Sequence, residues 1–292
     1  MSTFTAIGPA LAIDGPLPRP PSYSLLTVPG VADGDSHVYD GLPSLQAVEQ
    51  TRWANSANIW GYPKDVPSTW EPCSSATFRT KSQISTQPKP LFSAFGIYLP
   101  IVCTSSNIGD FEQFSNRAAR TLEATQAYAI EQAISQGVTT SNNPYFGDSN
   151  VVILAGGGAQ TITTGFAFLE QAIGASGRSG IIHAPPEVVS AGTYLLEKTE
   201  LGQILTVNGT EVASGTGYSG ATANGLTAGP GYAWVFATGY VEVRMTELML
   251  VPDDIRQTLS HFDNEVIVRA EKYALAIWDT AVQAAVKVHW AV

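Results

Sequence analysis

The chain has 292 residues, a net charge of −10, and 14% charged residues, where an ordinary soluble domain has about 25%. The acidic balance argues against nucleic-acid binding through a broad basic surface. No run of about 18 apolar residues is present that could cross a membrane. We therefore interpret the missing surface charge as that of a subunit that buries much of its outside against copies of itself.

The first 20 residues lack the basic start and the sustained apolar core of a signal peptide. Two cysteines, Cys73 and Cys103, exclude a disulfide scaffold and a zinc site made of four thiolates, and they fit a reducing compartment.

Residues 1–52 are expected to form an extended arm. Six prolines and several glycines before residue 35 exclude a long helix there, and a short helix is expected only from Leu42 to Trp53. Such a segment stays disordered alone, so neighbouring subunits are the simplest partners that could hold it.

The next segment, from Trp53 to about Phe92, is rich in tryptophan, proline, serine and threonine. Tryptophans on such an irregular stretch suggest side chains that anchor an interface with another subunit. The alternative is that they form a small local core under a loop. Phe78, Thr80 and Ser82 alternate with the charged residues Arg79 and Lys81, which predicts a hairpin exposed on both sides. The run 92–104, which begins with Phe92, predicts a buried strand.

The clearest prediction is a long helix over residues 110–136. Asp110 can cap its start and Gly137 can stop it, and a helix of this length measures about 39 Å. A loop follows at 142–148. The expected apolar stripe of the helix consists of Phe111, Phe114, Ala118, Leu122, Ala129 and Ala133.

The region after this loop alternates short strands and helices. Pro185 and Pro186 predict the start of one helix, and Asn208–Gly209 predicts a tight hairpin turn within a weakly charged loop region over 201–231. The expected elements are a strand at 151–154, helices at 162–174 and 185–196, and strands at 180–184 and 232–238. In the tail, residues 240–251 alternate as a strand, and a short helical piece follows Pro252. Residues 264–279 are expected to continue as a second long strand or strand pair, and 284–292 close the chain.

No motif indicates catalysis. Gly156–Gly158 lack the Lys-Ser/Thr that a phosphate-binding loop needs, and a turn is the simpler interpretation. Ser149 follows Gly-Asp but does not occupy a nucleophile elbow, and His183 is interpreted as a structural histidine. We predict no catalytic residue, no cofactor and no metal site.

Taken in order, the pieces resemble the Hong-Kong-97-type fold of tailed-bacteriophage major capsid proteins, an α+β fold shared with encapsulin shell proteins. The stretches that carry the resemblance are FEQFSNRAARTLEATQAYAIEQAISQG for a spine helix, GFAFLEQAIGASGRSGIIHAPPEVVSAG for an axial domain, and ATGYVEVRMTELMLVPDDI with NEVIVRAEKYALAIWD for a peripheral sheet. The resemblance implies an N-arm at 1–52, an E-loop with flanking strands at 53–95, a peripheral domain at 96–149 and 236–292, and an axial domain at 150–235. It also places the loop 199–225 near a five- or six-fold axis.

The function that the resemblance implies is self-assembly into hexamers and pentamers of an icosahedral shell that encloses double-stranded DNA. The chain would make no sequence-specific contact with this DNA and would bind no membrane. The particle would be assembled in the host bacterial cytoplasm, with portal and decoration proteins as further partners. Fewer than sixty residues precede the E-loop, so a separate scaffolding protein or none is expected. An encapsulin-like compartment is the alternative, and an oligomeric α/β hydrolase using Ser149 and His183 is a remote one. The residues expected at inter-subunit contacts are Trp53, Trp60, Trp70, Lys81, Phe92, Glu197, Lys198 and Glu200. For the last three, a solvated surface patch is the other interpretation.

Overall fold

The structure is a computed structural model that describes residues 24–27, 48–49, 91–92, 94–104, 111–138, 143–251, 259–260 and 265–291. The described residues fall into two compact units. The first holds those within 96–127 and 247–272, and the second holds those within 22–95, 128–246 and 273–292.

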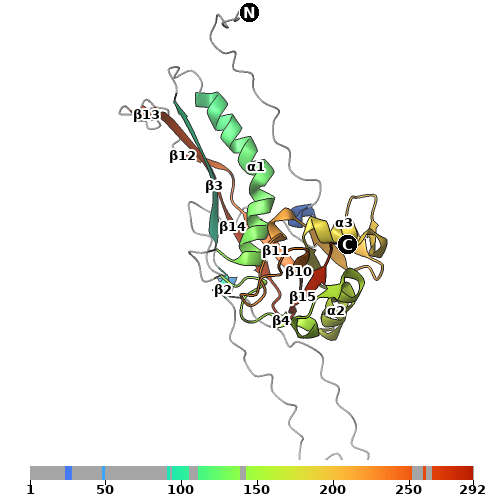
Figure 1. The fold of residues 1–292 in the computed structure, drawn as a ribbon. Coiled ribbons are helices and arrows are strands. Elements are labelled where there is room, and N and C mark those ends of the chain that lie inside the picture. Colours follow the sequence, from blue (N-terminus) through green and yellow to red (C-terminus); the bar gives the residue numbers. More distant parts are fainter. Residues whose placement is uncertain are drawn as a thin grey trace, which may run out of the picture. The chain divides into compact units, whose positions relative to one another are not determined.

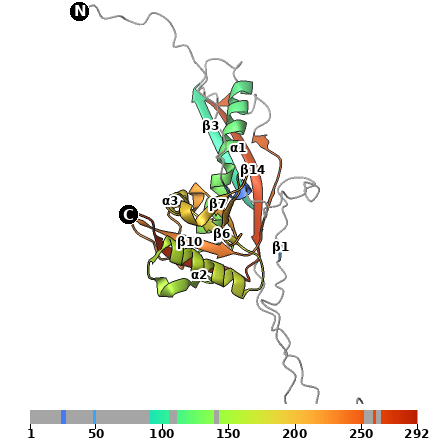
Figure 2. The same ribbon diagram turned by 90° about the vertical axis from the view of Figure 1, so that its right-hand side faces the viewer.

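The first unit is built on a sheet whose strands pair with the long strand β14 (Glu265–Trp278). Leu250 lies opposite Ala270 in this sheet, and the first half of helix α1 runs alongside β3 and β14 (Figures 1 and 2). The strands that pair with β14 here are β3 (Phe95–Thr104), β12 (Met249–Val251) and β13 (Leu259–Ser260).

Helix α1 (Phe111–Gln136) confirms the long helix that the sequence predicts. It stops where Gly137 adopts a left-handed backbone with φ of 83°, and the Gly137 N–H donates to the Ala133 carbonyl at 3.0 Å. The buried seam differs from the predicted stripe, since Ala129 and Ala133 are only partly buried. The larger buried side chains along the helix are Leu122, Ile130 and Ile134.

Strand β3 corrects the prediction of one buried strand over 92–104. Phe92 belongs to the separate short strand β2 (Leu91–Phe92), and β3 begins at Phe95. Along β3, Ile97 is buried whereas Gly96 and Tyr98 are exposed. One face of this sheet is therefore open, as antiparallel sheets allow.

The only described residues of the short helix expected at Leu42–Trp53 are Val48 and Glu49, and they form strand β1 instead. Val48 lies opposite Phe92 in an antiparallel pair. That prediction is wrong at these positions, because pairing with β2 overrides a weak helical spacing. The rest of the predicted arm, apart from residues 24–27, and the piece after Pro252 lie outside the described residues.

The second unit contains an eight-stranded sheet with the order β4-β15-β10-β6-β9-β8-β7, in which β5 also pairs with β15. Strands β10 and β15 run antiparallel for seven residues, and Val235 lies opposite Val286. The strands are β4 (Val152–Ile153), β5 (Gln160–Thr161), β6 (Ile181–Ala184), β7 (Leu196–Lys198), β8 (Ile204–Thr206), β9 (Glu211–Ser214), β10 (Tyr232–Thr238) and β15 (Gln283–His289).

Helix α2 (Ile162–Ala175) covers one face of this sheet (Figure 1). Thr161 caps its start by accepting the Thr164 N–H. Gly165 lets the helix come close, since a Cβ there would lie 2.5 Å from a methyl group of Val288. The core between helix and sheet includes Phe166, Leu169, Ile182, Val212, Val235 and Val286.

Several predictions for this unit are confirmed: α2, β6, β10, and the turn at Asn208–Gly209, where Gly209 has φ of 83°. The helix expected at 185–196 is shorter, because α3 (Pro186–Ala191) is followed by a 3-10 turn and by β7. The expected loop region over 201–231 is wrong in part, since it contains β8 and β9. These strands are three and four residues long, too short to leave a periodic pattern.

In the tail, β11 (Val241–Met245) pairs with β14, so that Val243 faces Ala276. The expected domain boundary at residues 235 and 236 falls inside β10. Residues 283–289, expected in the peripheral domain, pair with β10 rather than with β14. The division into arm, E-loop, peripheral and axial domains stays a prediction.

Candidate inter-subunit surface

The predicted contact residues fall into three groups. Trp53, Trp60, Trp70 and Lys81 lie outside the described residues. Phe92 is buried inside the subunit with 1% of its surface exposed. Its ring packs edge-on against that of Trp278, with the two ring centroids 4.7 Å apart. Such a side chain leaves almost no surface for a neighbouring chain. Glu197, Lys198 and Glu200 are exposed.

These three charged residues lie at an edge of the eight-stranded sheet. Among the described residues β7 pairs only with β8. The backbone N–H and C=O groups on the other side of β7 therefore have no described strand as a partner. Exposed apolar side chains flank the charges, with Tyr194 68% and Leu201 84% exposed. Edge strands beside exposed apolar groups favour pairing with another chain.

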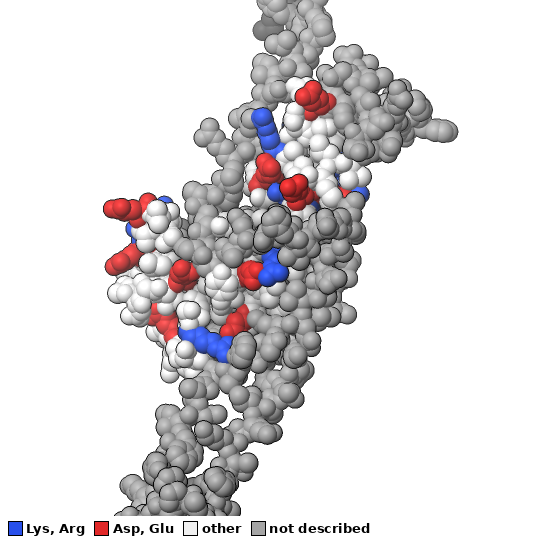
Figure 3. Space-filling view, turned by 180° about the vertical axis from the view of Figure 1, so that it is seen from behind, with Lys and Arg blue, Asp and Glu red and all other residues white. Residues whose placement is uncertain are grey.

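The turn between β8 and β9 is tied to α2 by hydrogen bonds on either side of an exposed valine. Glu170 on α2 accepts the Thr206 hydroxyl at 2.5 Å and the Asn208 amide at 2.7 Å. Val207 at the tip is 70% exposed. Seen from behind, the charged side chains of the described surface gather in small groups between larger uncharged areas (Figure 3).

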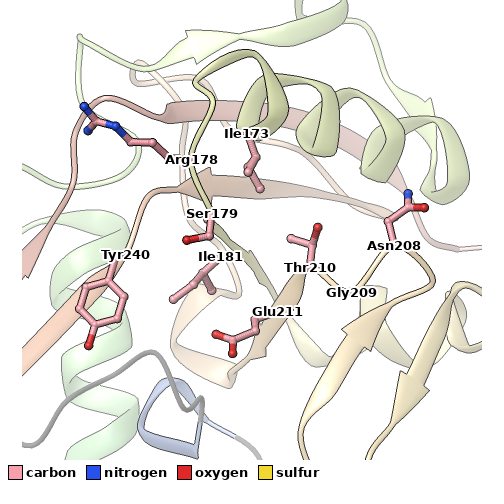
Figure 4. A pocket seen from close by; sticks show the side chains of 10 residues that line it. Ile173, Arg178, Ser179, Ile181, Asn208, Gly209, Thr210, Glu211 and Tyr240 are labelled. Atoms are coloured by element: carbon pink, nitrogen blue, oxygen red, sulfur yellow. The ribbon is translucent and has the colours of Figure 1, made fainter. Parts of the chain in front are cut away.

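A hollow of about 380 Å³ opens where β6 and β9 begin. Glu211, Ile181 and Tyr240 surround it in Figure 4. The guanidinium of Arg178 reaches away from the hollow, toward Asp279, to which it donates at 2.5 Å. The other lining residues are Ile173, Ser179, Gly180, Asn208, Gly209 and Thr210.

A buried carboxylate joins distant segments of the second unit. Glu131 on α1 is 1% exposed and accepts the backbone N–H groups of Leu25 at 2.9 Å and Gly217 at 3.1 Å. Burial raises the pKa of Glu131 from 4.5 to about 7, against the opposing effect of these two hydrogen bonds. Glu131 is not predicted as a functional residue from the sequence; the available signal is an acidic residue between Ile130 and Ile134 on an apolar seam.

His183 is a fully satisfied structural histidine, as the sequence analysis favours. Its two ring nitrogens contact the Tyr218 hydroxyl at 3.1 Å and the Thr238 hydroxyl at 2.8 Å. Burial lowers the pKa of His183 from 6.5 to about 3. Ser149 is exposed, and neither nitrogen of the buried His183 is left to activate it. The two residues therefore do not form the nucleophile and base of a hydrolase.

Within the described ranges, no three histidine, cysteine, aspartate or glutamate side chains gather as metal ligands. No described helix is long and apolar enough to cross a membrane.

No protein-family model and no curated protein matches this chain. Several solved structures match it. The major capsid protein gp27 of phage G, solved with gp26 decoration proteins, matches with a TM-score of 0.55 at 9% identity, over 99% of both chains. The capsid of an empty GTA particle matches with a TM-score of 0.53 at 14% identity, over 99% of this chain and 96% of that one. The native GTA capsid gives 0.51 at 12% identity, over 99% and 96%. The chain has the fold of these capsid proteins, the Hong-Kong-97-type fold that the sequence predicts.

Proposed function

We propose that this chain is a major capsid protein that assembles into hexamers and pentamers of an icosahedral shell enclosing double-stranded DNA. The observation that carries the proposal is the agreement of fold over 99% of the chain with gp27 of phage G. Fold alone does not fix function, so the proposal also needs a surface suited to assembly.

The composition and the surface supply that support. Only 14% of the residues are charged, and the edge around β7 exposes Tyr194 and Leu201 beside Glu197, Lys198 and Glu200. A shell buries such surfaces in heterologous contacts that close into rings, and many modest contacts add up. Trp53, Trp60, Trp70 and Lys81 remain proposed contacts of the same kind.

In this proposal the chain acts without catalysis or a cofactor. It forms the capsid of a virion assembled in the host bacterial cytoplasm. Its partners are copies of itself, a portal protein, and separate scaffolding or decoration proteins. The packaged DNA is held without sequence-specific contact, which suits an acidic chain.

The test is to purify the native particle, image it by electron microscopy, and measure nuclease-protected nucleic acid. Closed icosahedral shells built of this chain and filled with DNA are expected. Shells that enclose a protein cargo and no DNA would favour the encapsulin-type alternative. A solitary globule at micromolar concentration would overturn both.

A further inference from the structure

The starting point is an unpaired carboxylate in the described part of the second unit. The acidic side chains there with polar partners are Glu131, Asp148, Glu170, Glu187, Glu242 and Asp279. Glu197, Glu200 and Glu211 have no such partner among the described residues, and of these Glu211 alone is partly buried. It lines the hollow of Figure 4 with Ile181 and Tyr240.

A chain that covers this hollow must supply a positive charge. Removing a carboxylate from water without pairing it with a positive charge is unfavourable. The hollow offers hydroxyl groups from Ser179, Thr210 and Tyr240, and apolar wall from Ile173 and Ile181. An apolar stem that ends in an ammonium group fits such a lining, because lysine packs its methylenes on apolar surface and keeps its charge at the tip.

The same part of the structure contains one unpaired cation. Its basic residues are Arg178, Lys198, Arg244 and Lys287. Arg178 and Arg244 form ion pairs with Asp279 and Glu242, and Lys287 lies 5.8 Å from the centre of the Trp234 ring. Among the described residues of this unit, only exposed Lys198 has neither an ion pair nor a ring contact.

The strand register places the two unpaired charges on opposite faces of the sheet. Glu197 lies opposite Leu205 and Leu205 lies opposite Glu211, so these three share a face. Lys198 lies opposite Ile204 on the other face. That other face is the one covered by α2, since Thr206, two positions from Ile204, donates to Glu170 of that helix.

Because the two side chains leave the sheet on opposite faces, they form no ion pair within one subunit, whereas the Lys198 of a neighbouring copy can approach the Glu211 face from outside. Such a contact joins different surfaces of two copies, and heterologous contacts of this kind close into rings. Glu197 adds a second negative charge to the receiving face.

We propose that the hollow at Glu211 receives the Lys198 side chain of a second copy of this chain. The inference rests on the proposed assembly function and names one pair of residues at the contact between neighbouring subunits. Leu201 and Tyr194, exposed beside Lys198, supply apolar surface around the ion pair.

The first experiment uses the unaltered full-length chain. Assembled particles made from a mixture of isotopically light and heavy subunits are treated with a carbodiimide, which joins an amine and a carboxylate only when they touch. Mass spectrometry should find the Lys198–Glu211 peptide pair, with mixed isotope labels that prove a link between copies. Links from Glu211 to a different lysine, or no link at Glu211, would overturn the proposal.

The second experiment reverses the charges. Lys198→Glu and Glu211→Lys should each lower the assembled fraction roughly tenfold, because repulsion is repeated at every contact in the ring. The double variant should restore assembly. Glu123→Lys, which alters an exposed carboxylate on α1, controls for net charge, and circular dichroism controls for folding.

The outcomes separate the two proposals. Single variants that assemble normally, or a double variant no better than the singles, would refute the Lys198–Glu211 contact while leaving the capsid function standing. An unaltered chain that never assembles would refute both. If a variant fails to fold, the cross-link in the unaltered chain decides.

Discussion

The carboxylate of Glu131 accepts the backbone N–H of Leu25 at 2.9 Å, although the two residues lie 106 positions apart. The same carboxylate accepts the Gly217 N–H at 3.1 Å. One side chain on α1 therefore fixes a short N-terminal turn (Leu25–Thr27) and the loop after β9. Because the group is buried, its ionisation is coupled to the stability of the subunit.

This coupling predicts a defined pH dependence. The pKa of Glu131 rises from 4.5 to about 7 on folding, so the folded chain holds the proton more tightly than the unfolded chain. Stability from this group is greatest below pH 4.5 and falls as the pH rises toward 7, by up to about 3 kcal/mol. Glu131→Gln should remove this fall, as measured by denaturant unfolding of unassembled subunits between pH 4.5 and 7.5.

Glu123→Gln, an exposed change on the same helix, should leave that pH profile as it is in the unaltered chain. A Glu131→Gln profile that falls between pH 4.5 and 7.5 as steeply as the parent would contradict the prediction.

His183 predicts a slope of the opposite sign. Its pKa falls from 6.5 to about 3 on folding, so stability from the neutral ring is fully present above pH 6.5 and is lost as the pH falls toward 3. His183→Gln should cost roughly 2 kcal/mol at pH 7.5 by disturbing the contacts with Tyr218 and Thr238. The difference from the parent should shrink at pH 5, and a constant or growing difference would count against this. Exposed His289→Gln is the control.

The glycine beside Glu131 predicts a packing effect. A Cβ on Gly217 would lie 2.5 Å from the Glu131 Cβ and 2.6 Å from the Tyr128 carbonyl oxygen. Gly217→Ala should destabilise the subunit by about 1–3 kcal/mol, since α1 and the loop cannot both keep their places. Gly174→Ala in α2 meets nothing within 4 Å and should instead stabilise by up to about 1 kcal/mol. Thermal unfolding of both variants provides the measurement, and equal melting temperatures would refute the close-packing argument.

The tryptophans divide into two expected roles. Trp278 is buried with 1% exposure, so Trp278→Ala should destabilise the subunit by about 3–5 kcal/mol. Trp60→Ala and Trp70→Ala should weaken capsomer formation while leaving subunit stability close to the parent. Size-exclusion chromatography combined with melting curves distinguishes the two. An unchanged elution profile for both Trp60 and Trp70 variants would remove them from the interface.

The elements that could be predicted from sequence are those with local signals. Helix α1 combines apolar residues at helical spacing with a stop at Gly137, and its bounds agree with the structure. β10 is an apolar run between turn residues, and its bounds also agree. In such segments the local pattern and the final packing favour the same conformation.

Where partners lie far away in the chain, the local signal fails. β9 (Glu211–Ser214) pairs with β6, so that Glu211 lies opposite Ile181 from an earlier part of the chain. β8 (Ile204–Thr206) pairs with nearby strands but is too short to show a periodic pattern. Glu131 binds the backbone N–H groups of Leu25 and Gly217. The three residues are far apart in the sequence, and no motif or periodic pattern relates them. Lys198 and Glu211 lie on opposite faces of the sheet because of the strand register, and the sequence alone does not determine that register.

The position of β15 has a consequence for how the subunit is made. This last strand is paired on both sides, by β10 along one edge and by β4 and β5 along the other. Residues 283–289 therefore lie between strands that all precede them in the chain. During synthesis β4, β5 and β10 are made first, and this side of the sheet can close only once residues 283–289 have followed.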